Sequence, residues 1–191
     1  IPRGEGTFTE FGPIALSQGE VAFRGRGSTR LFAGGRVAQD GIYLGNAPND
    51  LIAVADTTTP IPYGRGIFTS FGALAHDQGD VAFVGFGSNG QQGIYLRHGG
   101  TLRKVIDADV QDRLGNDKAV DQFHVGRQAL SGNRIVFHVS FADGSNGIYV
   151  AQLQADTKHT VTIGSAEFEN IDFGSRGVPG EIRGQVFNDL D

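Results

Sequence analysis

An internal repeat constrains the fold of this chain more than any other feature of its sequence. Three motifs recur in fixed order: GTFTEFG (6–12) as GIFTSFG (66–72), QGEVAF (18–23) as QGDVAF (78–83), and GIYL (41–44) as GIYL (93–96) and GIYV (147–150). Repeats of this length usually mark one supersecondary unit that buries its apolar face by stacking on its neighbours. We therefore expect a three-repeat domain over residues 1–155 and a separate extension over 156–191. The units are expected to span about 6–65, 66–120 and 121–155.

Each unit has the pattern of four short β-strands joined by tight turns. Apolar residues alternate in EVAFRG and GIYL, so that Val21 and Phe23 share one face of a strand. The 30 glycines suit such turns, because glycine adopts positive φ without steric cost. We predict an all-β fold of three tandem four-stranded antiparallel repeats with a C-terminal β extension. The sheets could stand as propeller blades, close as a β-prism or stack in an open array, and the sequence does not choose among these.

The period-two pattern also predicts which side chains form the core. The predicted core residues are Val21, Phe23, Ile42, Leu44, Val81, Phe83, Ile94, Leu96, Ile135, Phe137, Ile148 and Val150. Phe11 and Phe71, each followed by a glycine, are expected at equivalent places in the first two units. We expect that glycine to let the backbone approach a neighbouring unit closely.

The phrases FTSFG, QGDVAF, GIYL and VADTTTPIP, in this order, resemble a repeat found in tandem in large secreted bacterial surface proteins. This resemblance covers about residues 1–150 and implies an extracellular or cell-surface location, with no enzymatic activity attached. HTVTIGSAEFENIDFG (159–174) and GEIRGQVFNDLD (180–191) resemble the lead-in and first strand of an adhesin B-type repeat, an immunoglobulin-like sandwich of bacterial adhesins. Because the chain begins at Ile1 and contains no Met, we interpret it as a processed product.

Composition and motifs argue against several functional classes. The net charge is −5 and no basic run exists, which argues against a nucleic-acid surface. No apolar stretch approaches the roughly 18 residues of a membrane span. The match of 85–90 to GxGxxG is interpreted as a turn, because GIYL follows where a nucleotide-binding helix would begin. The five histidines lack metal-ligand spacing and the chain has no cysteine, so we predict no catalytic residues.

The best metal candidate is the acidic segment that contains Asp107, Asp109 and Asp112. Calcium takes six to eight oxygen ligands, which carboxylates and backbone carbonyls of such a loop can supply. We predict a solvated acidic connection between units two and three and no cofactor, with a calcium site at these carboxylates as the alternative. Asp107 stands at the same repeat position as Asp56, which favours a structural role such as turn capping at both.

Thr57, Thr58 and Thr59 precede Pro60 and form a possible O-glycosylation site in a secreted protein. The alternative is an extended linker, because the residue before a proline is restricted to extended backbone.

The segment Glu181–Phe187 has strand character, with Ile182 and Val186 on one face and Phe187 on the other. An isolated strand exposes unpaired backbone groups, and adding it to the sheet of a neighbour satisfies them. Such a contact is head-to-tail and can build a filament. The alternative is a free tail whose partner domain has been removed.

Together these features predict a non-enzymatic extracellular structural or adhesive protein. We expect a subunit of a fibril or matrix whose partners are copies of itself. The alternative is a carbohydrate-binding module of a secreted surface protein that binds glycans. A sugar site would need exposed aromatic rings at the same place in each unit, and the recurring rings are Tyr43, Tyr95 and Tyr149.

Overall fold

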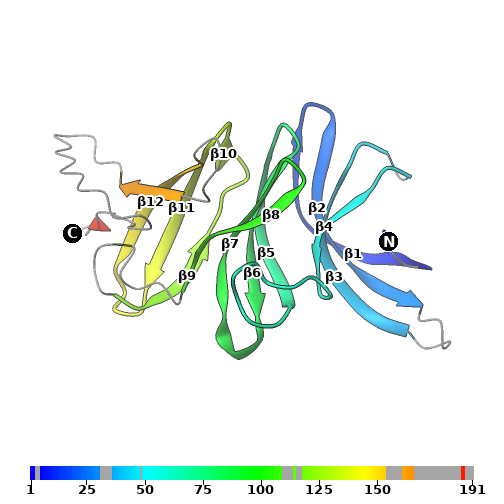
Figure 1. Ribbon diagram of the computed structural model, residues 1–191, viewed down its shortest axis with the longest axis horizontal. Coiled ribbons are helices and arrows are strands. Elements are labelled where there is room, and N and C mark those ends of the chain that lie inside the picture. Colours follow the sequence, from blue (N-terminus) through cyan, green and yellow to red (C-terminus); the bar gives the residue numbers. More distant parts are fainter. Residues whose placement is uncertain are drawn as a thin grey trace.

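The computed structural model of the chain is all-β (Figure 1). It describes residues 1–2, 5–30, 36–47, 49–108, 114, 118–153, 161–165 and 186–187. These residues contain no α-helix, and a 3₁₀ turn spans Ser88–Gly90. Accordingly, no described helix has the length and apolar character needed to cross a membrane.

The first two units form separate four-stranded antiparallel sheets whose strands are hydrogen-bonded in chain order. Unit 1 consists of β1 (Glu5–Ser17), β2 (Glu20–Arg30), β3 (Arg36–Gly45) and β4 (Ile52–Asp56). Unit 2 consists of β5 (Phe68–Asp77), β6 (Asp80–Gly87), β7 (Gln92–His98) and β8 (Thr101–Asp107). Both sheets confirm the predicted fold class and the predicted equivalence of the repeats.

Unit 3 has the same four strand positions, but both of its outer positions are split between two short strands. Its centre is β11 (Arg134–Phe141) paired with β12 (Asn146–Leu153). The outer positions hold β9 (Val120–His124) and β10 (Leu130–Ser131) beside β11, and β13 (Val161–Ser165) and β14 (Val186–Phe187) beside β12. Two strands from the expected extension over 156–191 therefore complete the third sheet instead of standing apart from it.

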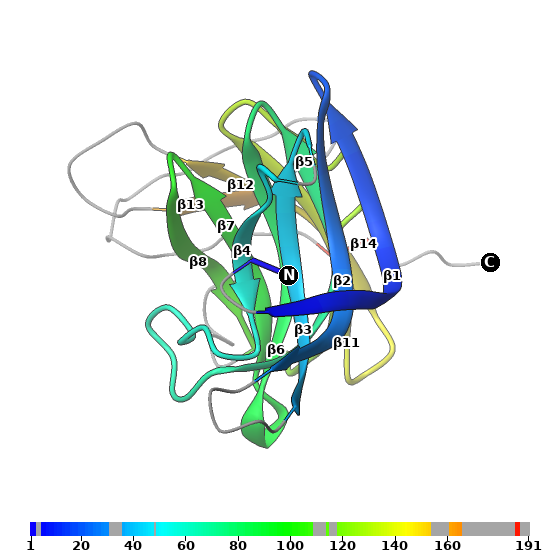
Figure 2. The same cartoon turned by 90° about the vertical axis from the view of Figure 1, so that its right-hand side faces the viewer.

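The three sheets stand side by side in an open row with unit 2 in the middle (Figure 1). Seen from the unit 1 end, β1–β4 lie in front of the other two sheets (Figure 2). One buried apolar cluster lies between units 1 and 2, and a second lies between units 2 and 3. Of the three arrangements considered from the sequence, the structure has the open array.

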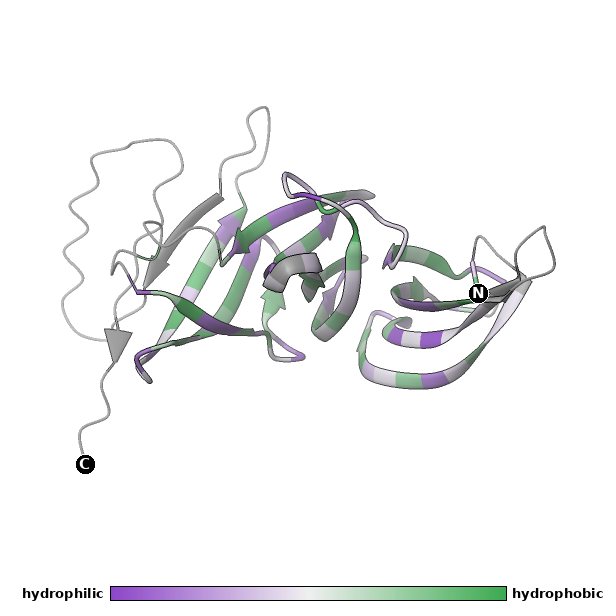
Figure 3. Ribbon diagram, turned by 90° about the horizontal axis from the view of Figure 1, so that it is seen from below, coloured by the Kyte–Doolittle hydropathy of each residue, from purple (hydrophilic) through white to green (hydrophobic). Residues whose placement is uncertain are grey.

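Each sheet has two chemically different faces, because successive side chains of a strand point to opposite sides. Hydrophobic and hydrophilic residues alternate along many strands (Figure 3). The aromatic face carries the cross-strand pairs Phe23–Tyr43, Phe83–Tyr95 and Phe137–Tyr149. The opposite, aliphatic face carries the pairs Ala22–Leu44, Ala82–Leu96 and Val136–Val150. In both cores, the aromatic face of one unit packs on the aliphatic face of the unit before it.

The predicted core is confirmed inside the row and fails at its ends. Ile148 is 49% exposed, so its assignment to the core is wrong. Val21, Phe23 and Val150 are only half-buried. These four residues lie on the aromatic face of unit 1 or the aliphatic face of unit 3, which no other described sheet covers. Periodicity identifies the side chains that share a face, but not whether that face has a neighbour.

Phe11 and Phe71 occupy equivalent places, as predicted. Phe11 stands opposite Gly25 in the ladder of unit 1, and Phe71 stands opposite Gly85 in unit 2. Both rings lie on the aromatic face of their sheet, so the repeat equivalence extends to individual side chains.

The glycines that follow these rings do not approach a neighbouring unit, and that expectation is wrong. A Cβ atom on Gly12 would lie 3.3 Å from Cδ of Arg24, and one on Gly72 would lie 3.2 Å from Cβ of Val84. Both contacts lie within the same sheet. The small residue therefore accommodates a side chain of the adjacent strand, next to a shift in strand register.

Candidate assembly site

The outer edge of β12 is the place where the C-terminal segment joins the fold. β13 pairs with Tyr149–Leu153, and β14 pairs with the first two residues of β12. In that register Phe187 stands opposite Asn146, and Val186 stands opposite Gly147. Val186 and Phe187 are thus in a strand, as predicted, whereas Ile182 lies outside the described residues.

A signal for this edge lies in the repeat pattern of the sequence. LIAVADT (51–57) and LRKVIDA (102–108) supply the fourth strands of units 1 and 2, and no third copy of this motif follows GIYV. Unit 3 must therefore take its fourth strand from a different segment. The strand character of the donor could be predicted, but the acceptor residues Asn146 and Gly147 could not.

In this single chain, β14 pairs with its own β12. Donation, as predicted from the sequence, requires the β12 of another copy. Exchange of identical elements between copies reproduces every contact of the intrachain pair, which makes it a low-cost route to assembly. Residues 166–185 separate β13 from β14 in the sequence, and a segment of that length can span at most ~70 Å.

The turn that leads into β12 is fixed by a compact set of polar contacts. The backbone N–H and the hydroxyl of Ser145 donate to Oδ1 of Asp143 at 3.0 and 2.5 Å. Lys118 Nζ lies 2.9 Å from Oδ2 of the same carboxylate. The Ser145 hydroxyl and then Lys118 hold the pKa of Asp143 well below its ordinary value. The acceptor end of β12 therefore begins from a well-defined turn.

The structure places one of the three predicted calcium ligands. Asp107 ends β8, is buried, and accepts a hydrogen bond on Oδ2 from Lys104 Nζ at 2.5 Å. Asp109 and Asp112 lie outside the described residues. Among the residues that the structure does describe, no three His, Asp or Glu side chains gather as a metal site would require. The calcium site stays a prediction, and the one placed carboxylate is paired with an ammonium group.

Asp56 caps the turn after β4, as its repeat position suggested. Its Oδ1 accepts from the N–H of Thr58 at 2.9 Å and from the hydroxyls of Thr58 and Thr59 at 2.6 and 3.1 Å. Gln39 Nε2 donates to Oδ2 at 3.0 Å. Burial by itself would raise the pKa of Asp56, but these hydrogen bonds outweigh burial and lower it. The equivalent Asp107 bonds to a lysine instead, so the two positions share burial but not a partner.

The threonines predicted as glycan acceptors belong to this turn. Thr58 is exposed, and Thr57 and Thr59 are half-buried. Since the hydroxyls of Thr58 and Thr59 both donate to Asp56, a glycan on either would have to replace one of these hydrogen bonds. O-glycosylation at this turn stays a prediction.

The three recurring tyrosines lie on the aromatic faces and are fully buried. Burial raises the pKa of Tyr43, and the carboxylates of Asp56 and Asp40 raise it further. Rings in this position do not provide the exposed stacking surface that a sugar site would need. No observation on these residues favours the carbohydrate-binding alternative.

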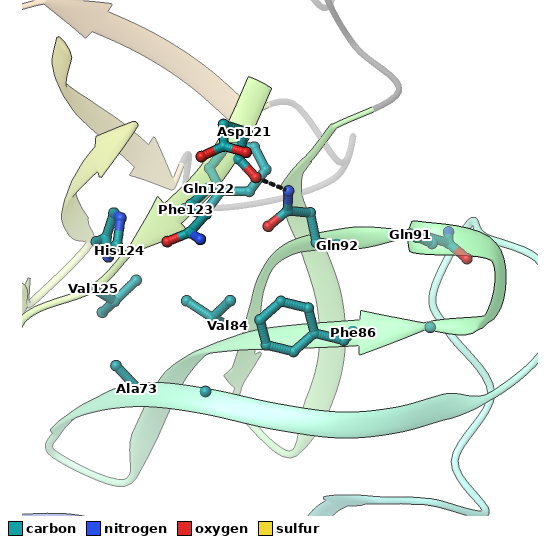
Figure 4. A pocket seen from close by; sticks show the side chains of 13 residues that line it. Ala73, Val84, Phe86, Gln91, Gln92, Asp121, Gln122, Phe123, His124 and Val125 are labelled. Atoms are coloured by element: carbon teal, nitrogen blue, oxygen red, sulfur yellow. Dashed lines mark hydrogen bonds between the residues drawn. The ribbon is translucent and has the colours of Figure 1, made fainter. Parts of the chain in front are cut away.

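A pocket of about 470 Å³ lies between units 2 and 3 (Figure 4). Ala73, Val84 and Phe86 form its unit 2 wall, and residues 122–125 of the third unit form the other. Gln92 Nε2 donates to the backbone carbonyl of Asp121 and ties the two walls together. The titratable residues that line the pocket are Asp121 and His124, both from unit 3.

No protein family model, curated protein or solved structure matches this chain.

Proposed function

We propose that the chain is a non-enzymatic structural or adhesive subunit of an extracellular assembly, joined head-to-tail through its C-terminal β-strand. The observation that carries this proposal is the split fourth position of unit 3, where the short strand β14 adds to the open edge of β12. A neighbouring copy can supply this strand in the same register. Strand addition of this kind gives affinity through main-chain hydrogen bonds.

The rest of the molecule supports this proposal. A row of sheets that does not close presents a different surface at each end, and heterologous contacts between such ends propagate from copy to copy. The extracellular location rests on the resemblance of the repeats to secreted bacterial surface proteins. The adhesive role rests on the resemblance of 159–191 to an adhesin repeat.

The test uses the absence of cysteine from the chain. Two variants, Asn146→Cys and Phe187→Cys, each carry one thiol at facing positions of the β12–β14 pair. Facing residues of an antiparallel pair have Cα atoms about 4.5–5.5 Å apart, which is within the range of a disulfide. If copies exchange β14, oxidation of the mixed variants gives a disulfide-linked dimer, and negative-stain images of the native chain show filaments.

The matched control mixes Phe187→Cys with Ile52→Cys, whose exposed side chain lies on β4, far from β12 in the chain. The double variant Asn146→Cys/Phe187→Cys shows where the bond forms when both thiols are in one chain. A monomeric protein in which this disulfide forms only within one chain would overturn the proposal.

A further inference from the structure

The aromatic face of unit 1 consists of side chains whose counterparts in unit 2 are buried. Phe11 is 66% exposed, whereas the equivalent Phe71 is 1% exposed. Ile14 is likewise exposed, whereas Leu74 is buried. The difference arises because unit 1 covers the aromatic face of unit 2, while no described sheet covers the aromatic face of unit 1. The aromatic face of unit 1 is therefore equivalent to a face that another unit covers inside the row, but here it is exposed.

The aliphatic face of unit 3 shows the complementary exposure at the other end of the row. Val136 and Ile148 are 43% and 49% exposed. They occupy the register positions of Ala82 and Ile94, which are fully buried in unit 2 beneath the aromatic face of unit 3. Exposed apolar patches of this kind on a folded protein mark interaction sites.

Polar contacts between successive hairpin turns define how one unit seats on the next. The Ser17 hydroxyl of unit 1 accepts from the N–H of Gln78 in unit 2 at 3.3 Å. Asp77 holds the matching position in unit 2, and its Oδ2 accepts from the N–H of Gly132 in unit 3 at 2.9 Å. The same turn position is therefore a hydrogen-bond acceptor in both internal interfaces.

The two ends of the row carry the equivalent groups: a hydrogen-bond acceptor on unit 3 and a hydrogen-bond donor on unit 1. Ser131 occupies the acceptor position in unit 3, is exposed, and has no partner for its hydroxyl among the described residues. In unit 1, the donor that corresponds to the Gln78 amide is the N–H of Gln18, at the exposed β1–β2 turn.

From these matching halves, we infer that a second copy of this chain docks the aromatic face of its unit 1 on the aliphatic face of unit 3. The docked copy continues the row in the geometry that already occurs twice within each chain. In this contact, Phe11 and Ile14 of one copy cover Val136 and Ile148 of the other. The backbone N–H of Gln18 donates a hydrogen bond to the hydroxyl of Ser131. This docked interface is a second contact between copies, distinct from the β12–β14 strand pair of the proposed function. It rests on that function only because both require the chain to associate with itself.

Cross-linking between copies tests this contact directly. His76 Nε2 of unit 2 lies 3.3 Å from Oε2 of Glu20 in unit 1. The corresponding positions at the ends of the row are Leu16 and Arg134, both exposed. Because that contact joins the tips of two long side chains, a bismaleimide linker replaces a direct disulfide. An equimolar mixture of Leu16→Cys and Arg134→Cys chains treated with this linker should give a cross-linked heterodimer. Neither variant alone should form this cross-link, because the contact joins unlike faces.

Charged substitutions on each face provide the second measurement. Phe11→Asp in the Leu16→Cys chain, or Ile148→Lys in the Arg134→Cys chain, should lower the yield of heterodimer by about tenfold or more. The matched control is Ile67→Lys, which alters an exposed apolar residue outside both faces and should leave the yield unchanged. Circular dichroism and the midpoint of unfolding of each variant monitor its fold.

A heterodimer yield no higher than that of Arg134→Cys mixed with Ile67→Cys would overturn the inference. Equal yields with and without Phe11→Asp would also overturn it, as would cross-linking of each variant to itself. These results are separate from the test of strand exchange. A disulfide between positions 146 and 187 of different copies, found without a cross-link between positions 16 and 134, would support the proposed function. The same result would refute the docking of unit 1 on unit 3.

Discussion

At the scale of single residues, glycines determine how closely the aromatic rings lie on the sheets. A Cβ atom on Gly85 would lie 2.6 Å from Cε1 of Phe68, and one on Gly25 would lie 2.7 Å from Cδ1 of Phe8. These distances are shorter than a side chain tolerates, so the ring requires a glycine beneath it. In unit 3, the position of Gly25 and Gly85 is occupied by Val139, whose buried side chain takes the space that the ring occupies in units 1 and 2.

The glycine of the repeated GIY motif has a similar role. A Cβ atom on Gly147 would lie 2.6 Å from Cε2 of Tyr149, and one on Gly41 would lie 2.9 Å from the hydroxyl oxygen of Tyr43. The tyrosine ring lies over the residue two positions before it on the same face of the strand. In unit 2, a Cβ atom on Gly93 would instead lie 2.5 Å from the backbone carbonyl oxygen of Ile106, so the tyrosine ring accounts for the glycine in units 1 and 3 and the adjacent strand accounts for it in unit 2.

We predict that Gly85→Ala lowers the free energy of unfolding by about 1–3 kcal/mol, because the added methyl group displaces the Phe68 ring. Gly126→Ala is the matched control, since a Cβ atom there meets nothing within 4 Å, and we expect a change within ~0.5 kcal/mol. Urea denaturation followed by circular dichroism measures both. Equal effects of the two substitutions would contradict this account of the glycines.

At the scale of the β-sheets, equivalent strands of different units contribute unequally to the free energy of folding, because the units occupy different places in the row. The aromatic faces of units 1 and 2 have the same rings in the same register, yet among the described sheets only that of unit 2 has a neighbour that covers it. Burial of apolar area is what makes a side chain stabilising, at roughly 25 cal/mol per Å² removed from water. Sequence equivalence therefore does not imply energetic equivalence.

The pair Phe11 and Phe71 tests this difference. We predict that Phe71→Ala costs about 3–5 kcal/mol of folding free energy, because it leaves a cavity in the core between units 1 and 2. Phe11→Ala should cost less than about 1 kcal/mol in dilute monomeric protein, since most of its ring is already in water. Chemical denaturation at low protein concentration gives both values. If Phe11→Ala cost as much folding free energy as Phe71→Ala, the Phe11 ring would have to be buried in the folded protein, contrary to this account.

At the scale of the whole molecule, unit 2 couples the two ends of the row. Both of its faces are buried, one in each core. Asp77 adds a polar link, because its carboxylate accepts from Ser17 of unit 1 at 3.3 Å and from the Gly132 amide of unit 3 at 2.9 Å. Loss of unit 2 structure would expose both cores at once, so the units depend on one another.

We therefore predict a single cooperative unfolding transition for the three sheets. Phe71→Ala and Phe137→Ala lie in different cores, and each should lower the midpoint of that same transition. Differential scanning calorimetry should give equal calorimetric and van't Hoff enthalpies. Two transitions, each shifted by only one of the substitutions, would show that the row unfolds unit by unit, as weakly coupled repeats can.

The sequence by itself determined the strands and turns that recur in the repeats, and the equivalence of the units. These properties are local, because the alternation of Val81 and Phe83 fixes which face each occupies whatever lies opposite. It also indicated strand character at Val186 and Phe187 and the turn-capping role of Asp56. Each of these follows from a few neighbouring residues and their backbone preferences.

Only the tertiary structure decided which faces are covered and which edges are filled. Ile94 and Ile148 stand at the same repeat position, yet the first is buried and the second is exposed. The acceptor edge at Asn146 depends likewise on a segment 40 positions later in the chain. Burial is a property of two surfaces that meet, and a repeat with a two-residue period describes only one of them.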